Sequence, residues 1–534
     1  MEEYNNEIVK ENLNQSKKKS NKLMIILIIL ITLITLIILG SSIYFFILKK
    51  DNTQSIPGGT SEVKKENKYS QYQLKSNTLE DFDLYFMQLE NNNKNMLYSP
   101  LSIKYALELL NEGADGDTKE QITNILGSYT NKKYQNNQNM SFANALFIRN
   151  NFKDNINQTY IDTLNNTYNA QVVYDDFKNP KKINNWVSNK TYNLINNLYD
   201  NISDQDFILA NALGIDMEWV KKIQADNYED RYAVSFDHED FNMFVGSLDD
   251  MDYTELKFEN LDYKAKATKF GAVINKYDII SELGEDNIRK TVNQAYQKWL
   301  TSDEYCGDDF DNTFDMEKYI AELKDNYEHI SSSTDFEFYT DDDTKVFAKD
   351  LKTYNDTTLQ YIGIMPTTKT LSDYSKNTNA EKLNTLINNL KSIKLANFKD
   401  GVITQITGYV PMFKFDYKLE LVKDLNTLGI TDVFDKEKAN LSKLSSADAY
   451  INDARHQANI EFSNEGIKAA AATSMGGAGS VGCWFDYRFD VPVEEIDLTF
   501  DKPYMFIIRD KNSGEVWFMG SVYEPTKFTP NLGE

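Results

Sequence analysis

Histidine is the first residue type to consider for catalysis, and the 534-residue chain contains only three: His238, His329 and His456. None belongs to an HExxH zinc motif, and the sequence has no Gly-x-Ser-x-Gly nucleophile elbow. His456 precedes an alternating apolar pattern over residues 458–462, which is typical of a strand. A lone histidine in such a strand is expected to be a hydrogen-bonded structural residue. The chain is therefore not expected to be an enzyme.

Three glycines, Gly477, Gly479 and Gly482, spell the GxGxxG pattern of dinucleotide-binding sites. That site requires an apolar strand before the glycines and a helix after them, because the pyrophosphate lies on the helix amino terminus. Neither flank fits here. The glycines favour instead an exposed loop with little side chain to obstruct an approaching protein.

A run of carboxylates at Asp309, Asp311 and Asp315 suggests a calcium loop, but the central glycine and terminal glutamate of the EF-hand pattern are missing. A solvated acidic surface explains the run more simply. We expect neither a metal site nor a cofactor.

Composition excludes further classes of protein. The chain is 41% apolar and 13% aromatic, which indicates a globular domain, and its net charge of −24 argues against a nucleic-acid partner. Two cysteines, Cys306 and Cys483, are too few for a disulfide scaffold. The domain must be stable through packing alone.

An uncharged, strongly apolar stretch over residues 23–48 is long enough to cross a bilayer as a helix. The alternative is a cleaved signal peptide, whose apolar region is shorter and ends in a small-residue cleavage site that is absent here. The sequence therefore predicts a transmembrane helix over 23–48.

Lysines beside this stretch predict its orientation by the positive-inside rule. The amino-terminal flank carries Lys17, Lys18, Lys19 and Lys22. Residues 1–22 are expected to form a cytoplasmic tail, residues 49–76 a polar flexible stalk, and residues 77–530 an extracellular domain. Lys49 and Lys50 on the other side weigh against this orientation.

The elements that could support a site begin with an amphipathic helix over residues 82–89. A strand then ends at Ser99-Pro100, and apolar residues recur at helical spacing from Ile103 to Leu110. The segment over residues 95–126, NMLYSPLSIKYALELLNEGADGDTKEQITNIL, resembles the first shared block of the serpins. Further blocks follow in the order of that family: FANALFIRN, LANALGIDMEW, NEGIKAAAAT, FDKPYMFIIRD and WFMGSVYEP.

The resemblance covers residues 77–530 and implies an α+β fold with three β-sheets, about nine helices and an exposed reactive-centre loop. Similarity nearly vanishes between residues 221 and 343, and we expect residues 270–335 to be a largely helical insertion. The chain resembles a membrane-anchored, bacterial-type serpin, located at the cell membrane with its inhibitor domain outside.

The resemblance also implies a set of site residues under and above the opening of the main sheet. The polar cluster beneath the opening is Ser99, Ser102, Asn211 and His456. The aromatic residue at the top of the opening is Trp219.

Small residues dominate the predicted hinge of the loop, which comprises Glu465, Gly466, Ile467, Ala469, Ala470, Ala471, Ala472 and Thr473. In a strand, alternate side chains face opposite sides, so Ile467, Ala469, Ala471 and Thr473 would share one uncharged face. Lys468 would point the other way. Such a segment can insert into a sheet after cleavage, whereas an alanine run could alternatively form a helix. Asn464 departs from the acidic residue usual in the family, and the loop is about a dozen residues longer than typical.

Spacing from Gly466 places the reactive bond between Ser480 and Val481, which elastase-like or subtilisin-like serine proteases would accept. Arg488 is the alternative, for a trypsin-like protease, and a cysteine protease is another possible target. The resemblance thus implies a suicide inhibitor of an extracellular serine protease. The alternative is a non-inhibitory serpin scaffold that serves as a surface binding or adhesion module.

Overall fold

The computed structural model describes residues 70–223, 253–302, 305, 313–467, 485 and 487–529. The predicted tail over 1–22 and membrane helix over 23–48 lie outside these residues. No helix within the described ranges is long and apolar enough to cross a membrane. Residues 70–76, which the sequence placed in the stalk, instead pack on the domain: Leu74 is fully buried, and its amide donates to the carbonyl of Ile125 at 2.9 Å.

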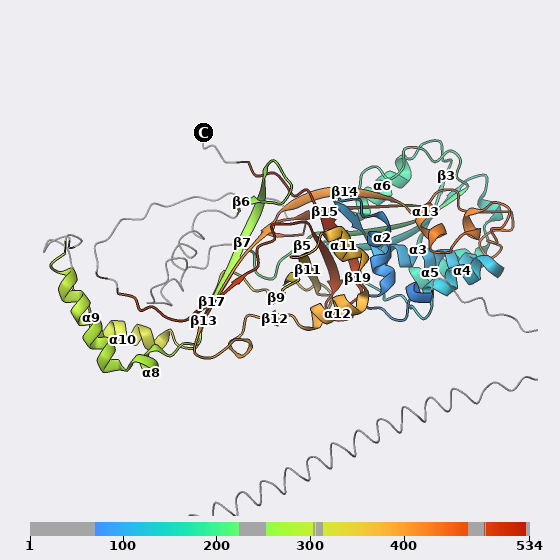
Figure 1. The fold of residues 1–534 in the computed structure, drawn as a ribbon. Coiled ribbons are helices and arrows are strands. Elements are labelled where there is room, and N and C mark those ends of the chain that lie inside the picture. The colour runs from blue at the N-terminus through green and yellow to red at the C-terminus, as the bar shows by residue number, and fades with distance from the viewer. Residues whose placement is uncertain are drawn as a thin grey trace, which may run out of the picture. The chain divides into compact units, whose positions relative to one another are not determined.

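A seven-stranded antiparallel sheet forms the centre of the domain (Figure 1). Its strands, in spatial order, are β1 (Met96–Tyr98), β19 (Val516–Val522), β18 (Tyr504–Asp510), β11 (Leu359–Pro366), β10 (Thr344–Asp350), β9 (Glu337–Thr340) and β12 (Lys391–Ser392). The middle strands β11, β18 and β19 are almost continuous apolar runs, because both of their faces are buried.

A second sheet carries the end of the predicted reactive loop. Its members are β17 (Val493–Asp497), β13 (Ile403–Pro411), β7 (Lys264–Asn275) and β6 (Thr254–Lys257), with β8 (His329–Ser332) paired to the end of β7. β17, which follows the loop, pairs in parallel with β13.

Two smaller sheets lie on either side of an opening. The first contains β3 (Gln171–Asp175), β2 (Met140–Arg149) and β4 (Phe207–Ile215). The second contains β14 (Phe413–Glu420), β15 (Arg455–Phe462), β16 (Gly466–Ile467) and β5 (Met217–Glu218). The described residues thus form four hydrogen-bonded sheets rather than the three expected, because no pairing between β4 and β15 joins these two into one.

The described residues form eleven α-helices rather than about nine. They are α2 (Asp81–Glu90), α3 (Pro100–Gly113), α4 (Gly116–Leu126), α5 (Gln158–Tyr168), α6 (Lys181–Lys190), α8 (Ile279–Leu283), α9 (Glu285–Trp299), α10 (Met316–Asp325), α11 (Leu371–Lys376), α12 (Ala380–Asn388) and α13 (Leu421–Thr427). Short 3-10 turns occur at Ser70–Tyr72, Lys153–Asn155, Leu395–Asn397 and Asp432–Phe434. The stretch over 270–335 contributes α8, α9 and α10, whereas its ends belong to β7 and β8. We call residues 279–325 the helical insert.

Candidate functional site

The opening between β4 and β15 is the feature around which the predicted site residues gather. Within the described part of the chain, β4 pairs only with β2, and β15 pairs with β14 and briefly with β16. A small cavity of ≈ 60 Å³ lies between them, lined by Leu209 and Asn211 of β4 and by His456 and Ala458 of β15. Among the residues that the structure describes, the facing edges of β4 and β15 are thus largely unpaired, and such edges can accept a further strand.

Helix α3 forms the floor of the opening, and its start is fixed by its sequence. Ser99 is the N-cap residue, since its Oγ accepts a hydrogen bond from the amide of Ser102 at 3.1 Å. Pro100 occupies the first turn, where its missing N–H is tolerated. Ser99 and Ser102 are both buried, so the cap holds them beneath the sheet.

Hydrogen bonds connect α3 to both sides of the opening. The Ser99 amide donates to Nε2 of His456 at 2.9 Å, and the Ser102 hydroxyl donates to Oδ1 of Asn211. Asn211 in turn donates to Oδ1 of Asn144 at 2.7 Å. The structure thus brings Ser99, Ser102, Asn211 and His456 together, as the resemblance implied. Asn144 was missed, although Asn144 and Asn211 face each other in the β2–β4 register, and pairing the two strand motifs could have found it.

Burial lowers the pKa of His456 to about 4. The ring is therefore neutral at neutral pH, which it must be if Nε2 is to accept the Ser99 N–H. In an unfolded chain the pKa is near 6.5. Between pH 6.5 and pH 4 the unfolded state thus binds a proton that the folded state does not, so acidification costs stability.

We expect His456→Gln to flatten the acid-side loss of stability, because glutamine retains an acceptor for the Ser99 amide but does not titrate. The difference between the folded and unfolded pKa values of His456 corresponds to at most about 3 kcal/mol of stability. Melting temperatures of the full chain between pH 7.5 and pH 4.5 measure this loss of stability in the variant and in wild type. The contributions of carboxylates such as Asp83 to the pH dependence are the same in both proteins and cancel in the comparison. If the melting temperature fell equally with pH in the variant and in wild type, the role assigned to His456 would be wrong.

Trp219 closes the upper end of the opening. Its indole is fully buried and donates from Nε1 to the carbonyl of Ser463 at 2.9 Å. The ring packs against Phe462, with centroids 5.5 Å apart, and against Tyr361, at 6.1 Å. Trp219 therefore connects the strand that follows β4 with the turn that follows β15.

The first hinge residues already lie between β5 and β15. Gly466 and Ile467 form β16, which pairs with Met217 and Glu218 of β5, and Ile467 is only 1% exposed. A Cβ at position 466 would stand 2.2 Å from the carbonyl oxygen of Met217, so only glycine allows this approach. Glu465 forms an ion pair with Lys222, and its carbonyl accepts the Trp219 amide at 3.0 Å.

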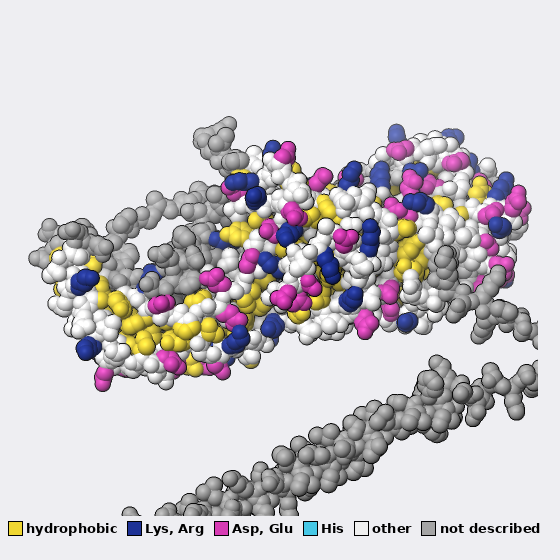
Figure 2. All heavy atoms as spheres, in the orientation of Figure 1, with side chains coloured by type: hydrophobic (Ala, Val, Ile, Leu, Met, Phe, Trp, Pro, Cys, Tyr) yellow, Lys and Arg dark blue, Asp and Glu magenta, His cyan; other side chains and the backbone are white. Residues whose placement is uncertain are grey.

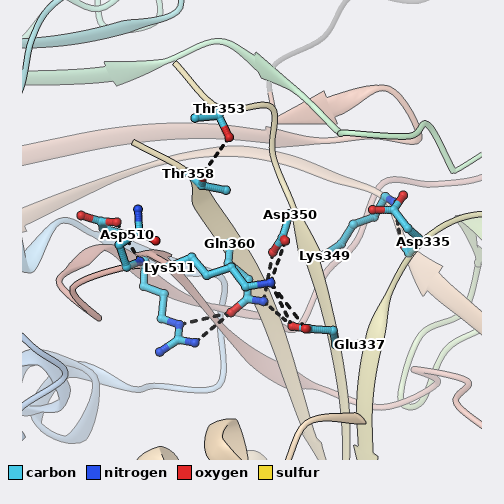
Figure 3. Close-up of polar contacts among 11 residues, drawn as sticks. Asp335, Glu337, Lys349, Asp350, Thr353, Thr358, Gln360, Asp510 and Lys511 are labelled. Atoms are coloured by element: carbon cyan, nitrogen blue, oxygen red, sulfur yellow. Dashed lines mark hydrogen bonds and ion pairs between the residues drawn. The ribbon is translucent and has the colours of Figure 1, made fainter. Parts of the chain in front are cut away.

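A polar network on the neighbouring strands of the central sheet supports this upper end (Figure 3). Lys511 forms ion pairs with Asp350 at 2.7 Å and Glu337 at 3.4 Å, and the side-chain amide of Gln360 donates to both carboxylates. The carbonyl of Asp350 accepts the amide of Val220, directly after Trp219, at 3.1 Å. Each charge in the network has a partner, which indicates a structural role. The resemblance did not point to it.

Of the remaining predicted site residues, the structure describes only Arg488. Ala469, Ala470, Ala471, Ala472, Thr473, Ser480 and Val481 lie outside the described residues. Arg488 is described: it is partly buried in a segment that contacts the helical insert, far along the chain from β16.

Comparison with known proteins gives a consistent result. The family model described as "Serpin (serine protease inhibitor)" matches residues 81–268 and 311–525 and leaves out most of the helical insert. A protein named "Uncharacterized serpin-like protein" from Methanosarcina mazei is 24% identical over 83% of this chain and 85% of its own length. Human neuroserpin is 23% identical over 82% of this chain and 88% of its own length.

Solved structures share the fold. The thermophilic serpin tengpin in its native state matches with a TM-score of 0.55 at 19% identity, over 89% of this chain and 98% of its own. Thyroxine-binding globulin in complex with thyroxine matches with a TM-score of 0.54 at 16% identity, over 86% and 98%. The same fold therefore occurs in a thermophilic serpin and in a thyroxine-binding globulin.

Proposed function

Because this chain belongs to the serpin family, we propose that it inhibits serine proteases as a suicide substrate. The observation that carries the proposal is the opening between β4 and β15, which are not paired with each other within the described residues, with Ile467 already buried at its upper end. A segment that continues from Ile467 between these strands would complete one sheet from the two that now flank the opening.

The proposed reaction begins with attack of the protease serine on the carbonyl of Ser480, which releases the amine of Val481 and leaves an ester between enzyme and inhibitor. The freed arm then inserts as a strand before water hydrolyses the ester. Alternate residues from Ile467 to Thr473 are uncharged and fit the buried face. New backbone hydrogen bonds along both edges drive the insertion, and the attached protease is carried along and distorted.

The favoured target is an extracellular serine protease with a small specificity pocket, elastase-like or subtilisin-like, because Ser480 is small. A cysteine protease is the second choice. We further propose that residues 23–48 anchor the inhibitor in the cell membrane, with the domain on the extracellular side. The basis is the apolar length of that stretch and the lysines before it.

The second candidate is a non-inhibitory scaffold that binds a partner at the surface. Thyroxine-binding globulin, which is described in complex with thyroxine, has the same fold. The helical insert favours this candidate, because an inhibitor requires no such addition.

Incubating the full chain with pancreatic elastase tests the two candidates. An inhibitor gives an SDS-stable complex, whereas a scaffold gives only the cut chain. Insertion of a strand adds on the order of ten backbone hydrogen bonds at about 1 kcal/mol each. The cut chain should then melt roughly 10 °C or more above the intact one. Elastase whose active-site serine is blocked serves as the control, and an unchanged melting temperature with no complex would overturn the inhibitor proposal.

A further inference from the structure

The segment that leaves the reactive loop packs on the helical insert. Phe485 and residues 487–491 precede β17, and we call them the anchor arm. Together with α8, α9, α10 and the ends of β7 and β13 they form a hydrophobic cluster separate from the main cores. Figure 2 shows hydrophobic side chains gathered along α9 and α10. The insert and the anchor arm therefore belong to one structural unit.

Aromatic contacts hold the first residue of the anchor arm. The ring of Phe485 lies against Phe314, Tyr296 and Trp299, with centroid distances of 5.0, 5.2 and 5.7 Å. Tyr296 also packs on Phe314 at 5.4 Å. Aromatic pairs at these distances are mutually stabilising, so Phe485 has a defined place on the insert.

The residues that follow are held by a hydrogen bond and by burial. The hydroxyl of Tyr319 in α10 donates to the carbonyl of Tyr487 at 3.0 Å. Phe489 and Val491 are buried, at 9% and 7% exposure, and Phe489 packs on Tyr487 at 5.1 Å. The arm then enters β17, which is hydrogen-bonded to β13. Contacts thus continue from Phe485 to the sheet.

Ion pairs and a hydrogen bond hold the helical insert in place. Arg289 of α9 forms ion pairs with Glu285 at 2.6 Å and with Glu317 of α10 at 2.7 Å, so it joins the two helices. The side-chain amide of Asn275, at the end of β7, donates to the carbonyl of Asn326 at 2.7 Å. The insert is therefore fixed to the sheet as well as to the arm.

We propose that the helical insert determines where the loop can be cut, by holding the anchor arm so that Arg488 is withheld from proteases. The inference rests on the proposed function only in taking the chain between β16 and β17 as the loop presented to a protease. It assigns the insert, together with Phe485 and Phe489, a specificity-determining role.

Steric contacts of the anchor arm withhold Arg488. A protease binds several residues on both sides of the bond it cuts as an extended strand. To present Arg488 in this way, the arm would have to withdraw Phe485, Tyr487 and Phe489 from the cluster. Removing the buried ring of Phe489 and the partly buried ring of Phe485 from the cluster lowers the population of the accessible state by a factor on the order of 100. A trypsin-like enzyme is thus disfavoured although arginine is present.

The test measures cleavage of the bond after Arg488 in the full chain by trypsin, with peptide products identified by mass spectrometry. The double variant Phe485→Ala, Phe489→Ala should be cut there about 100-fold faster than wild type. Tyr319→Phe, which removes only the hydrogen bond to the arm, should be cut several-fold faster. Tyr174→Ala, at an aromatic residue 45% exposed elsewhere on the domain, is the matched control and should equal wild type.

Equal cleavage after Arg488 in wild type and in both variants would overturn the proposal. Tyr319→Phe keeps the test decisive if the double variant does not fold, which its melting curve would reveal. Cleavage is counted whether or not a covalent complex forms. A chain without SDS-stable complexes can still show the protection of Arg488, so failure of the proposed function and failure of this inference are distinguishable.

Discussion

Replacing Ile467 with arginine is expected to turn the inhibitor into a substrate: elastase should still cut the loop, but complexes should fall about 100-fold relative to turnover. Ile467 is 1% exposed and belongs to the hydrophobic cluster that contains Phe462 and Trp219. Insertion must keep this position on the buried face of the completed sheet. An unpaired guanidinium there costs several kcal/mol, which stalls the first step of insertion while hydrolysis of the ester proceeds.

The uncut chain should tolerate the same change. β16 contains only two residues, so the hinge can leave the sheet at the cost of few hydrogen bonds. Lys468→Glu is the matched control, because its side chain is predicted to face the other way and a charge is already present there. SDS gels and melting curves of the cut chains give the readout. If Ile467→Arg formed complexes as efficiently as Lys468→Glu, the arm could not be inserting past this position.

The second large effect is expected at Lys104, whose replacement by methionine should destabilise the folded chain by about 3–5 kcal/mol. Its ammonium lies 2.7 Å from Asp83 and 3.3 Å from Glu515, and all three side chains are fully buried. Burial raises the pKa of Asp83 to about 6 despite the lysine beside it. Removing the only cation of this group leaves two buried carboxylates without compensation.

The loss in free energy of unfolding caused by Lys104→Met should be smaller at low pH. A carboxyl group whose folded-state pKa is raised stabilises the fold while protonated, and this contribution is lost as the pH rises through the raised value. Urea unfolding of the full chain at pH 5 and pH 8, followed by tryptophan fluorescence, measures the difference. Lys423→Met is the control, since Lys423 is 77% exposed and water screens its ion pair with Glu90, so its loss should change stability little. A similar loss for both variants would contradict the assignment.

The sequence was sufficient to predict the family and its α+β fold, both of which are confirmed. It also named the residues that meet at the opening, because Ser99, Ser102 and His456 lie in motifs with fixed positions relative to the sheet. Asn144 was missed because its role depends on the β2–β4 register, which joins segments far apart in the chain.

The contact between the helical insert and the anchor arm could not be predicted for a related reason. The aromatic residues of α9 and those after the loop each resemble ordinary core residues within their own segment. Only the tertiary structure brings Tyr296 and Phe485 together. The number of sheets was wrong because a family description counts the flanking strands as one sheet, whereas in this chain β4 and β15 are not paired within the described residues.

The pairing of β1 with β19 constrains how the protein is made. Met96 lies opposite Ser521, so a strand from the beginning of the domain pairs with one that is synthesised 425 residues later. Between β1 and β11, the central sheet is built entirely from β19 and β18. A nascent chain cannot close this sheet until β19 has left the ribosome, and until then its apolar strands remain a substrate for chaperones.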